Sequence, residues 1–212
     1  MKSLRALQEL VFPVRCLGCS ALGLDICSSC RKNWHPHIYR TWSTSAPHFP
    51  IYSAISYSPL AGKIILAAKE NGILRAENLI SDALSHSLAI CMKEQGLGFL
   101  IPIPSRKSVA RARGRQFIYD LSAGLATDFK ISSFEILSHV RKVKDQSTLD
   151  AHARRINLHG ALHASKYLRG RAILIDDLVT TGATLAEAAR ALRVCGIEVA
   201  AAVTACVAEP LR

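Results

Sequence analysis

Hydrophobic positions in the last third of the chain change period twice, from an unbroken run to helical spacing and back. Residues 172–175 form a short apolar run, which is typical of a parallel strand buried on both faces. The next apolar residues recur at helical spacing, at Leu185, Ala188, Ala189 and Leu192. Cys195-Gly196 ends this helix, and a second apolar run covers residues 197–207. The pattern predicts a βαβ unit with a right-handed crossover and parallel strands.

The rest of the chain predicts further strands and helices before this unit. Strands are expected at residues 51–57, 98–104 and 135–139, and helices at residues 59–69, 76–93 and 116–128. Residues 1–13 have the spacing of a short amphipathic helix, and residues 40–50, rich in Ser, Thr, Pro and His, indicate a linker. We therefore expect an α/β domain over residues 46–212, with a mainly parallel sheet flanked by helices, after a small unit over residues 1–45.

Chemistry-bearing residues stand where the strand of the βαβ unit meets its helix. Two carboxylates, Asp176 and Asp177, are followed by a turn of small and hydroxyl residues: Thr180, Thr181, Gly182, Ala183 and Thr184. Successive backbone N–H groups at a helix N-terminus bind phosphate, and the threonine hydroxyls add to them. The carboxylates instead accept hydrogen bonds, from sugar hydroxyls or from water bound to a divalent cation. The order predicts a ribose-5-phosphate site; the alternative is an acidic strand end before an ordinary N-capped helix.

The positive charge of the chain is concentrated in its middle. The net charge is +11, and residues 101–171 hold 14 Lys and Arg against 5 Asp and Glu, a surplus of nine. Five of these cations, including Arg106, Lys107 and Arg113, lie within residues 106–115, in an expected loop just after a strand that ends in Pro102 and Pro104. Such a concentration favours an anionic partner: diphosphate, nucleotide or nucleic acid. The alternative is a solvated basic face.

Four of the seven cysteines form two C-x2-C pairs, Cys16 with Cys19 and Cys27 with Cys30, seven residues apart. Two such knuckles supply the four thiolates of a tetrahedral structural Zn²⁺ site. The first 13 residues carry charges and make a poor signal peptide, and no apolar run approaches the roughly 18 residues that span a bilayer. We expect a cytoplasmic protein without membrane insertion, in which reducing conditions favour metal over disulfides.

These motifs together resemble the ComF family, which includes ComFC-like competence proteins and GntX-like proteins. The resemblance covers nearly the whole chain and rests on the following pieces: Phe12-Pro13, the four cysteines, residues 57–72, the Pro-Ile-Pro strand end, Arg113-Gly114, Gln146 with Leu149, Arg154-Arg155 with Asn157, and residues 176–184, which resemble the phosphoribosyl-diphosphate (PRPP) loop of type I phosphoribosyltransferases. One departure is Arg-Gly-Arg-Gln-Phe at residues 113–117, where the family usually has Arg-Gly-Phe-Asn-Gln.

The resemblance implies a phosphoribosyltransferase-type domain that binds PRPP with Mg²⁺, which PRPP itself would mainly hold. It implies that Asp176 and Asp177 hold the ribose and that residues 180–184 hold the 5-phosphate. Arg106, Lys107 and Arg113 are then the expected diphosphate ligands, with Gln146 and Arg154 on a closing loop. Two functions of different class follow: phosphoribosyl transfer to or from a nitrogenous acceptor, or non-enzymatic binding of nucleotide or single-stranded DNA in DNA uptake, with a competence helicase as a further partner. No base-recognition element stands out.

Overall fold

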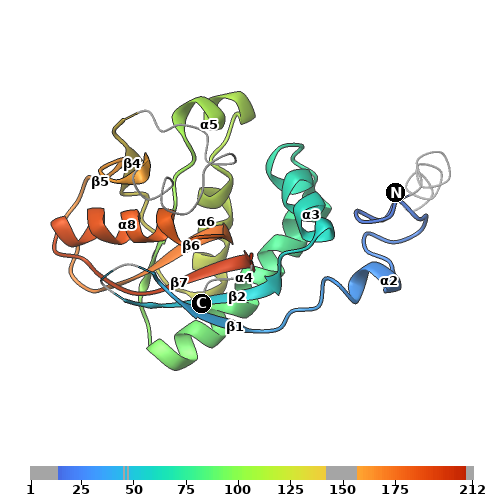
Figure 1. Ribbon diagram of the computed structural model, residues 1–212, viewed down its shortest axis with the longest axis horizontal. Helices are drawn as coiled ribbons and strands as arrows, with labels where there is room; N and C mark the ends of the chain where they lie inside the picture. Colours follow the sequence, from blue (N-terminus) through green and yellow to red (C-terminus); the bar gives the residue numbers. More distant parts are fainter. Residues whose placement is uncertain (1–13, 45, 47, 142–156, 209–212) are drawn as a thin grey trace.

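The computed structural model describes residues 14–44, 46, 48–141 and 157–208, and its centre is a five-stranded sheet (Figure 1). The strand order is β1-β2-β7-β6-β3. Their bounds are β1 Tyr39–Trp42, β2 Pro50–Ser56, β3 Phe99–Pro102, β6 Arg171–Val179 and β7 Glu198–Val207. β2, β7, β6 and β3 pair in parallel, and only β1 is antiparallel. The predicted α/β fold with a mainly parallel sheet is confirmed.

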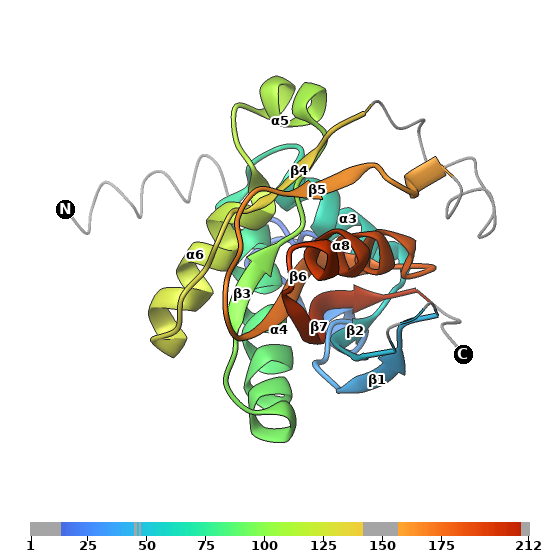
Figure 2. The same ribbon diagram turned by 90° about the vertical axis from the view of Figure 1, so that its left-hand side faces the viewer.

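Helices cover both faces of the sheet, so its central strands are buried on both sides (Figure 2). One face packs against α3 (Pro59–Lys69), α4 (Leu74–Gln95) and α6 (Phe117–Phe129). The other packs against α8 (Ala183–Val194). A two-stranded antiparallel sheet, β4 (Leu137–His139) with β5 (Leu162–Ala164), lies beside α8. The apolar runs of β6 and β7, residues 172–175 and 199–207, are continuous because these residues are buried on both faces of the sheet.

The βαβ unit has the predicted connection, but its first strand is longer than predicted. β6 continues through Asp176 and Asp177 to Val179, because Asp176, Leu178 and Val179 still pair with β7. The acids therefore sit within the strand rather than after it. The turn that follows places Gly182 at the helix N-cap with φ = 70°, a left-handed conformation that glycine adopts at little cost.

Two segments that we expected to be irregular contain regular structure. Part of the predicted linker is β1, whose residues 39–42 pair with residues 50–53 of β2. Part of the predicted basic loop is helix α5, Lys107–Arg113, which ends at Gly114 with φ = 74°. In both cases the sequence lacks a clear apolar period, because β1 has only half-buried and exposed positions and α5 has no buried residue.

The cysteine-rich segment packs against the sheet domain. Ile26 and Trp34, only 2% and 4% exposed, belong to the same core as Tyr52 and the buried face of α3. Gly18 fits closely here: a Cβ on it would lie 2.5 Å from Leu60 Cδ1 and 2.7 Å from Cys30 Sγ. The segment also contains the short helix α2, Ser28–Arg31. The amphipathic helix predicted for residues 1–13 lies outside the described residues.

Candidate functional site

The carboxyl ends of the parallel strands meet at one edge of the sheet, where ligands of such sheets bind. The turn after β6 lies at this edge, and a small cavity of about 30 Å³ is lined by Asp176 and residues 178–185. Within the turn, the Ala183 N–H donates to Thr181 Oγ1 at 3.4 Å. The Thr44 hydroxyl, from the loop between β1 and β2, donates to Thr181 O at 3.3 Å. The turn that the sequence predicts to bind phosphate is therefore held by a hydrogen bond from a distant part of the chain.

The two acids differ in their surroundings. Asp177 is 4% exposed, and its carboxylate lies 2.5 Å from Nζ of Lys69, which is the last residue of α3. Burial alone would raise the pKa of Asp177, but the Lys69 ammonium outweighs it and the pKa is lowered. Asp176 is half-buried, and one of its oxygens accepts from the Asp177 N–H at 2.9 Å. Burial, and then the charge of Asp177, raise the pKa of Asp176.

Lys69 completes this site and was missed as a site residue by the sequence analysis. A lysine at the C-terminal end of a helix interacts favourably with the helix dipole, so its position alone indicated this structural role as much as contact with a ligand. Burial opposes its charge, but the carboxylates of Asp177 and Asp176 raise the pKa of Lys69 overall. No local pattern links Lys69 to an acid 108 residues away.

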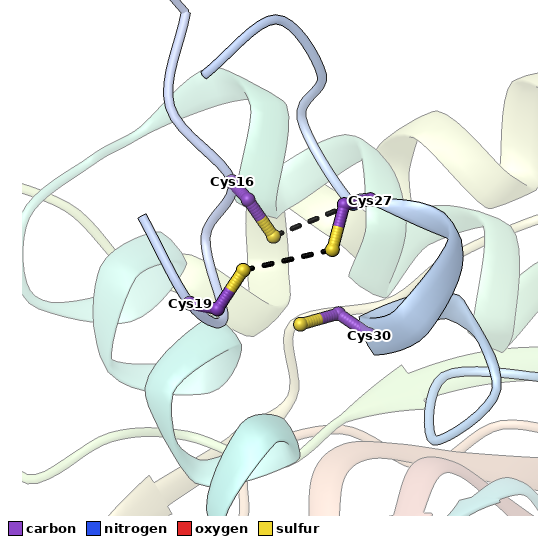
Figure 3. A group of neighbouring side chains, drawn as sticks. All are labelled: Cys16, Cys19, Cys27 and Cys30. Atoms are coloured by element: carbon purple, nitrogen blue, oxygen red, sulfur yellow. Dashed lines mark hydrogen bonds between the residues drawn. The ribbon is translucent and has the colours of Figure 1, made fainter. Parts of the chain in front are cut away.

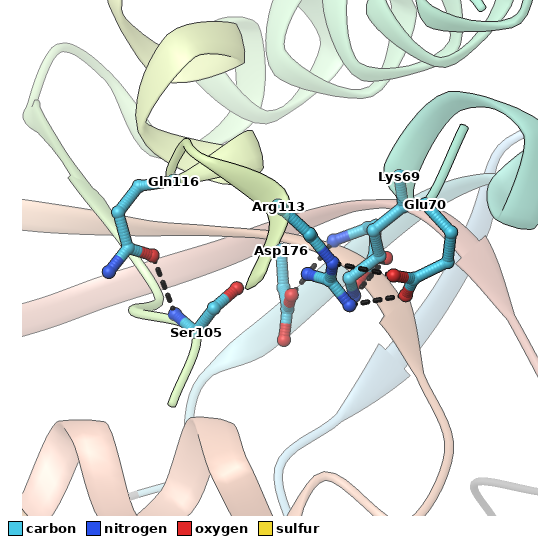
Figure 4. Close-up of polar contacts among 7 residues, drawn as sticks. Lys69, Glu70, Ser105, Arg113, Gln116 and Asp176 are labelled. Carbon is cyan, nitrogen blue, oxygen red and sulfur yellow. Dashed lines mark hydrogen bonds and ion pairs between the residues drawn. The ribbon is translucent and has the colours of Figure 1, made fainter. Parts of the chain in front are cut away.

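Arg113, the last residue of α5, pairs with Glu70, which follows Lys69 in the chain (Figure 4). Its Nε donates to Glu70 Oε2 at 2.7 Å, and its Nη2 donates to Glu70 Oε1, so the two side chains form a bidentate pair. The Arg113 side chain is only 10% exposed. Its Nη1 is buried and has no hydrogen-bond partner among the described residues. A buried guanidinium N–H without a partner is costly, so this atom is suited to an anionic ligand.

Arg106 and Lys107 lie in different surroundings from Arg113. They line a cavity of about 610 Å³ together with residues of α5, β4 and the chain after β4: Ser108, Arg111, His139, Val140 and Arg141. The three predicted diphosphate ligands are thus divided between two environments. Of the departing Arg-Gly-Arg-Gln-Phe residues, Gln116 accepts from the Ser105 N–H at 3.0 Å, and Arg115 pairs with Glu77 at 2.7 Å. Gln146 and Arg154 lie outside the described residues.

α8 connects the turn to the small sheet. Glu187, only 5% exposed, accepts from the Leu162 N–H of β5 at 3.0 Å, and Arg190 donates to Leu162 O at 3.0 Å. Glu187 and Arg190 also pair with each other at 2.7 Å. Although burial opposes ionisation, the contacts with Arg190 and Leu162 lower the pKa of Glu187. Both backbone groups of Leu162 are therefore held by the helix that begins at the turn.

The four predicted metal ligands converge at one point (Figure 3). The sulfur atoms of Cys16, Cys19, Cys27 and Cys30 all lie within 4.8 Å of one another. Cys19 and Cys27 are 3.6 Å apart at sulfur, and the Cys27 N–H points to Cys16 Sγ at 3.4 Å. The set is positioned to bind a metal ion, and four sulfur ligands at these separations are consistent with tetrahedral zinc.

One protein-family model matches the part of the chain that contains the turn. Residues 111–210, from α5 to the end of β7, match the family model described as "Phosphoribosyl transferase domain". That region includes β6, the acid pair, the turn and α8, whereas Lys69, Glu70 and the four cysteines lie before it.

Solved structures similar to this chain include phosphoribosyltransferases. An adenine phosphoribosyltransferase aligns with a TM-score of 0.42 and 13% identity, over 82% of this chain and 86% of its own. The Trypanosoma brucei adenine phosphoribosyl transferase, in complex with AMP, pyrophosphate and ribose-5-phosphate, aligns with a TM-score of 0.41 and 13% identity, over 84% and 88%. No curated protein matches the sequence. Among the described residues, no helix is long and apolar enough to cross a bilayer.

Proposed function

We propose that this protein binds PRPP and transfers its phosphoribosyl group to or from a nitrogenous acceptor. The observation that carries the proposal is the order of groups at the sheet edge, within residues 111–210, which match the phosphoribosyl transferase model. An acid pair in β6 is followed directly by a glycine-containing turn whose N–H groups begin α8. Carboxylates accept hydrogen bonds from sugar hydroxyls, and the N–H groups at the helix N-terminus donate to a phosphate, so one ligand with both groups fits the site.

The proposed roles follow from the surroundings of each residue. Residues 180–184 bind the 5-phosphate. Asp176 is the acid that faces the ligand most directly, because Asp177 is engaged by Lys69. Arg113 Nη1, with Arg106 and Lys107, binds the diphosphate. Gln146 and Arg154 stay proposals from the resemblance to the ComF family.

Phosphoribosyl transfer breaks the bond between the sugar C1 and diphosphate through an oxocarbenium-like sugar. Catalysis therefore needs positioning and charge neutralisation more than a protein nucleophile. Mg²⁺ would enter with PRPP, and the half-buried carboxylate of Asp176 offers the oxygen donors that this ion prefers. The ion would neutralise the leaving diphosphate. The four cysteines would hold Zn²⁺ in a structural role, and a cytoplasmic location suits reduced thiolates.

Calorimetry with Mg-PRPP and with ribose-5-phosphate tests the proposal. We expect both ligands to bind the wild-type protein. Replacing Asp176 and Asp177 by Asn should weaken both by at least about tenfold, since a hydrogen bond to a charged group contributes about 1.5–3 kcal/mol. Asp82→Asn with Asp128→Asn is the matched control, because it makes the same charge change at exposed positions of α4 and α6, away from β6. Unchanged affinity in the Asp176 and Asp177 variant would reject the assignment.

A second candidate function is the binding of single-stranded DNA in DNA uptake. The observation in its favour is the basic surface of α5, where Arg111 is exposed and Lys107 forms no ion pair with an acid among the described residues. A diphosphate and a DNA backbone both carry phosphate groups that bind cationic side chains, so we propose that the two ligands share this surface. Oligonucleotide anisotropy at several salt concentrations, with and without Mg-PRPP, tests this. Salt-dependent binding that saturating Mg-PRPP leaves undisturbed would refute the shared surface.

A further inference from the structure

Arg113 needs a partner outside α5 to hold its side chain in place. α5 has seven residues and none of them is buried, so the core does not fix the guanidinium. Glu70, the residue after α3, supplies the partner: its carboxylate accepts from Nε at 2.7 Å and also from Nη2 (Figure 4). A bidentate pair of this kind fixes the plane of the guanidinium as well as its position.

The pair with Glu70 leaves one nitrogen of Arg113 for a ligand. Nε and Nη2 form the edge that faces Glu70, and Nη1 lies outside that edge in the same plane. The Arg113 side chain is only 10% exposed, yet its buried Nη1 has no hydrogen-bond partner among the described residues. Such an N–H gains most from an oxyanion that arrives in the guanidinium plane. Glu70 therefore determines the direction from which a ligand meets Arg113.

The end of α3 that carries Glu70 is itself fixed at the proposed site. One face of α3 is buried in the core, and its last residue, Lys69, contacts Asp177 of β6 at 2.5 Å. Burial and, to a smaller extent, the charge of Arg113 act to lower the pKa of Lys69, although the two acids of β6 raise it overall. Arg113 is thus within electrostatic range of Lys69. Consecutive residues of the chain therefore connect α3 to an acid of β6 and to the arginine of α5.

Both cations at this place are already matched by an acid. Lys69 pairs with Asp177, and Arg113 pairs with Glu70. The contribution of Arg113 to diphosphate binding therefore depends on the direction of its free N–H more than on net charge. An arginine that rotated freely would have to be ordered when the ligand binds, which opposes binding through lost conformational entropy. The pair with Glu70 orders the side chain before the ligand arrives.

We propose that Glu70 is a positioning residue, which holds Arg113 so that Nη1 donates to the diphosphate of PRPP. The inference rests on the proposed function, in which Arg113 binds the diphosphate. It assigns a role to a residue that lies before the matched residues 111–210. Glu70 itself contacts neither the sugar nor the diphosphate and acts only through Arg113. It thereby fixes where the leaving group of the proposed reaction is held.

Calorimetry with Mg-diphosphate, Mg-PRPP and ribose-5-phosphate separates positioning from an effect on folding. Glu70→Gln keeps one acceptor oxygen but replaces the other with an NH₂ donor that faces the N–H groups of Arg113, so it breaks the bidentate pair. We expect both diphosphate-containing ligands to bind about three- to tenfold more weakly, which is the effect of ordering one long side chain on binding. Ribose-5-phosphate lacks the diphosphate, and its affinity should stay within about twofold of wild type.

Glu77→Gln is the matched control, because it makes the same replacement in the neighbouring arginine pair. Glu77 accepts from Arg115 through both carboxylate oxygens, at 2.7 and 3.0 Å, and its side chain is 17% exposed against 41% for Glu70. The control should therefore lower stability at least as much as Glu70→Gln, with the same change in net charge. Arg115 also donates to Ala68 O at 2.9 Å, which keeps its segment attached to α3. All three ligands should bind the control within about twofold of wild type.

A double-mutant cycle tests whether Glu70 acts through Arg113. Arg113→Met removes the guanidinium, and Mg-diphosphate should then bind at least about tenfold more weakly, because a charge-assisted hydrogen bond is lost. Adding Glu70→Gln to this variant should change the affinity by less than about twofold, since no side chain is left to position. A purely structural role would weaken binding by the same factor in both backgrounds.

Several results would overturn the inference. Equal or tighter binding of Mg-diphosphate to Glu70→Gln would mean that the carboxylate repels the ligand instead of orienting Arg113. An equal loss for ribose-5-phosphate, or an equal loss in Glu77→Gln, would make the effect one of folding. A full loss in the Arg113→Met background, or a wild-type protein that binds no Mg-diphosphate, would also count against it. If Mg-diphosphate binds and depends on Glu70 while Mg-PRPP does not bind, the positioning role stands and the proposed transfer is rejected.

Discussion

Replacing Lys69 by Met should destabilise the protein strongly. Among the described residues, Lys69 is the only cation that forms an ion pair with Asp177. The Lys69–Asp177 contact is 2.5 Å long, and the two side chains are 24% and 6% exposed. Met keeps the apolar stem of the lysine, so the interaction that is lost is mainly the electrostatic attraction to Asp177. Breaking a buried ion pair by removing one partner costs about 3–5 kcal/mol. Because Lys69 is partly exposed, we expect a loss of about 2–4 kcal/mol in the free energy of unfolding at pH 7.

A second estimate reaches the same range. Without Lys69, Asp177 can avoid a buried charge by keeping its proton. Keeping a carboxyl with an ordinary pKa near 4 protonated at pH 7 costs about 1.4 kcal/mol per pH unit, or about 4 kcal/mol. This sets an upper limit on the penalty at pH 7.

The loss should depend on pH with a definite sign. In the wild-type protein the pKa of Asp177 is lowered, so its contribution to stability is present above the ordinary carboxyl pKa and is lost as the pH falls through the folded pKa. In Lys69→Met the pKa of Asp177 should be raised instead. The difference between the two proteins should therefore be largest near neutral pH and shrink towards zero below about pH 4.

Urea unfolding followed by the fluorescence of the buried Trp34 measures this difference at each pH. Lys63→Met is the matched control, since Lys63 is an exposed lysine of the same helix that donates to Gly18 O at 3.0 Å. It should cost less than about 1 kcal/mol. A loss below about 1 kcal/mol in Lys69→Met, with no dependence on pH, would refute the electrostatic argument.

Three further predictions concern the rest of the molecule. Purified protein should contain one zinc per chain, and Cys27→Ser should lose it while circular dichroism still reports a folded sheet domain; a disulfide network without zinc would contradict this. Gly182→Val should abolish Mg-PRPP binding, because φ of 70° strains a β-branched residue and its side chain obstructs the turn; unchanged calorimetry would oppose that. Glu187→Gln should lower stability at neutral pH and flatten its fall in acid, since the lowered pKa of Glu187 stabilises the fold above the ordinary carboxyl pKa; parallel stability curves for the two proteins would count against this role.

The sequence by itself determined the elements whose information is local. In residues 172–207, an apolar run, then apolar residues at helical spacing, then a second apolar run predicted β6, α8 and β7. A strand buried on both faces and an amphipathic helix each have a distinct apolar pattern. The cysteine spacing predicted the four-sulfur cluster for the same reason, since each C-x2-C pair closes a knuckle within a few residues. Helix α3 was predicted with its observed bounds, from Pro59 at its start and Asn71-Gly72 after its end.

Only the tertiary structure decided which polar and charged groups meet. Lys69 and Asp177 are 108 residues apart, Arg113 and Glu70 are 43 apart, and Thr44 and Thr181 are 137 apart. Each pair depends on how helices and strands pack, and a surface charge has no period that names its partner. The same reason explains why one basic stretch was predicted as one diphosphate site. The turn of α5 directs Arg113 towards Glu70, whereas Arg106, Lys107 and Arg111 line the separate cavity. Residue spacing sets the chemistry available to the chain, but packing sets which of those groups face the same ligand.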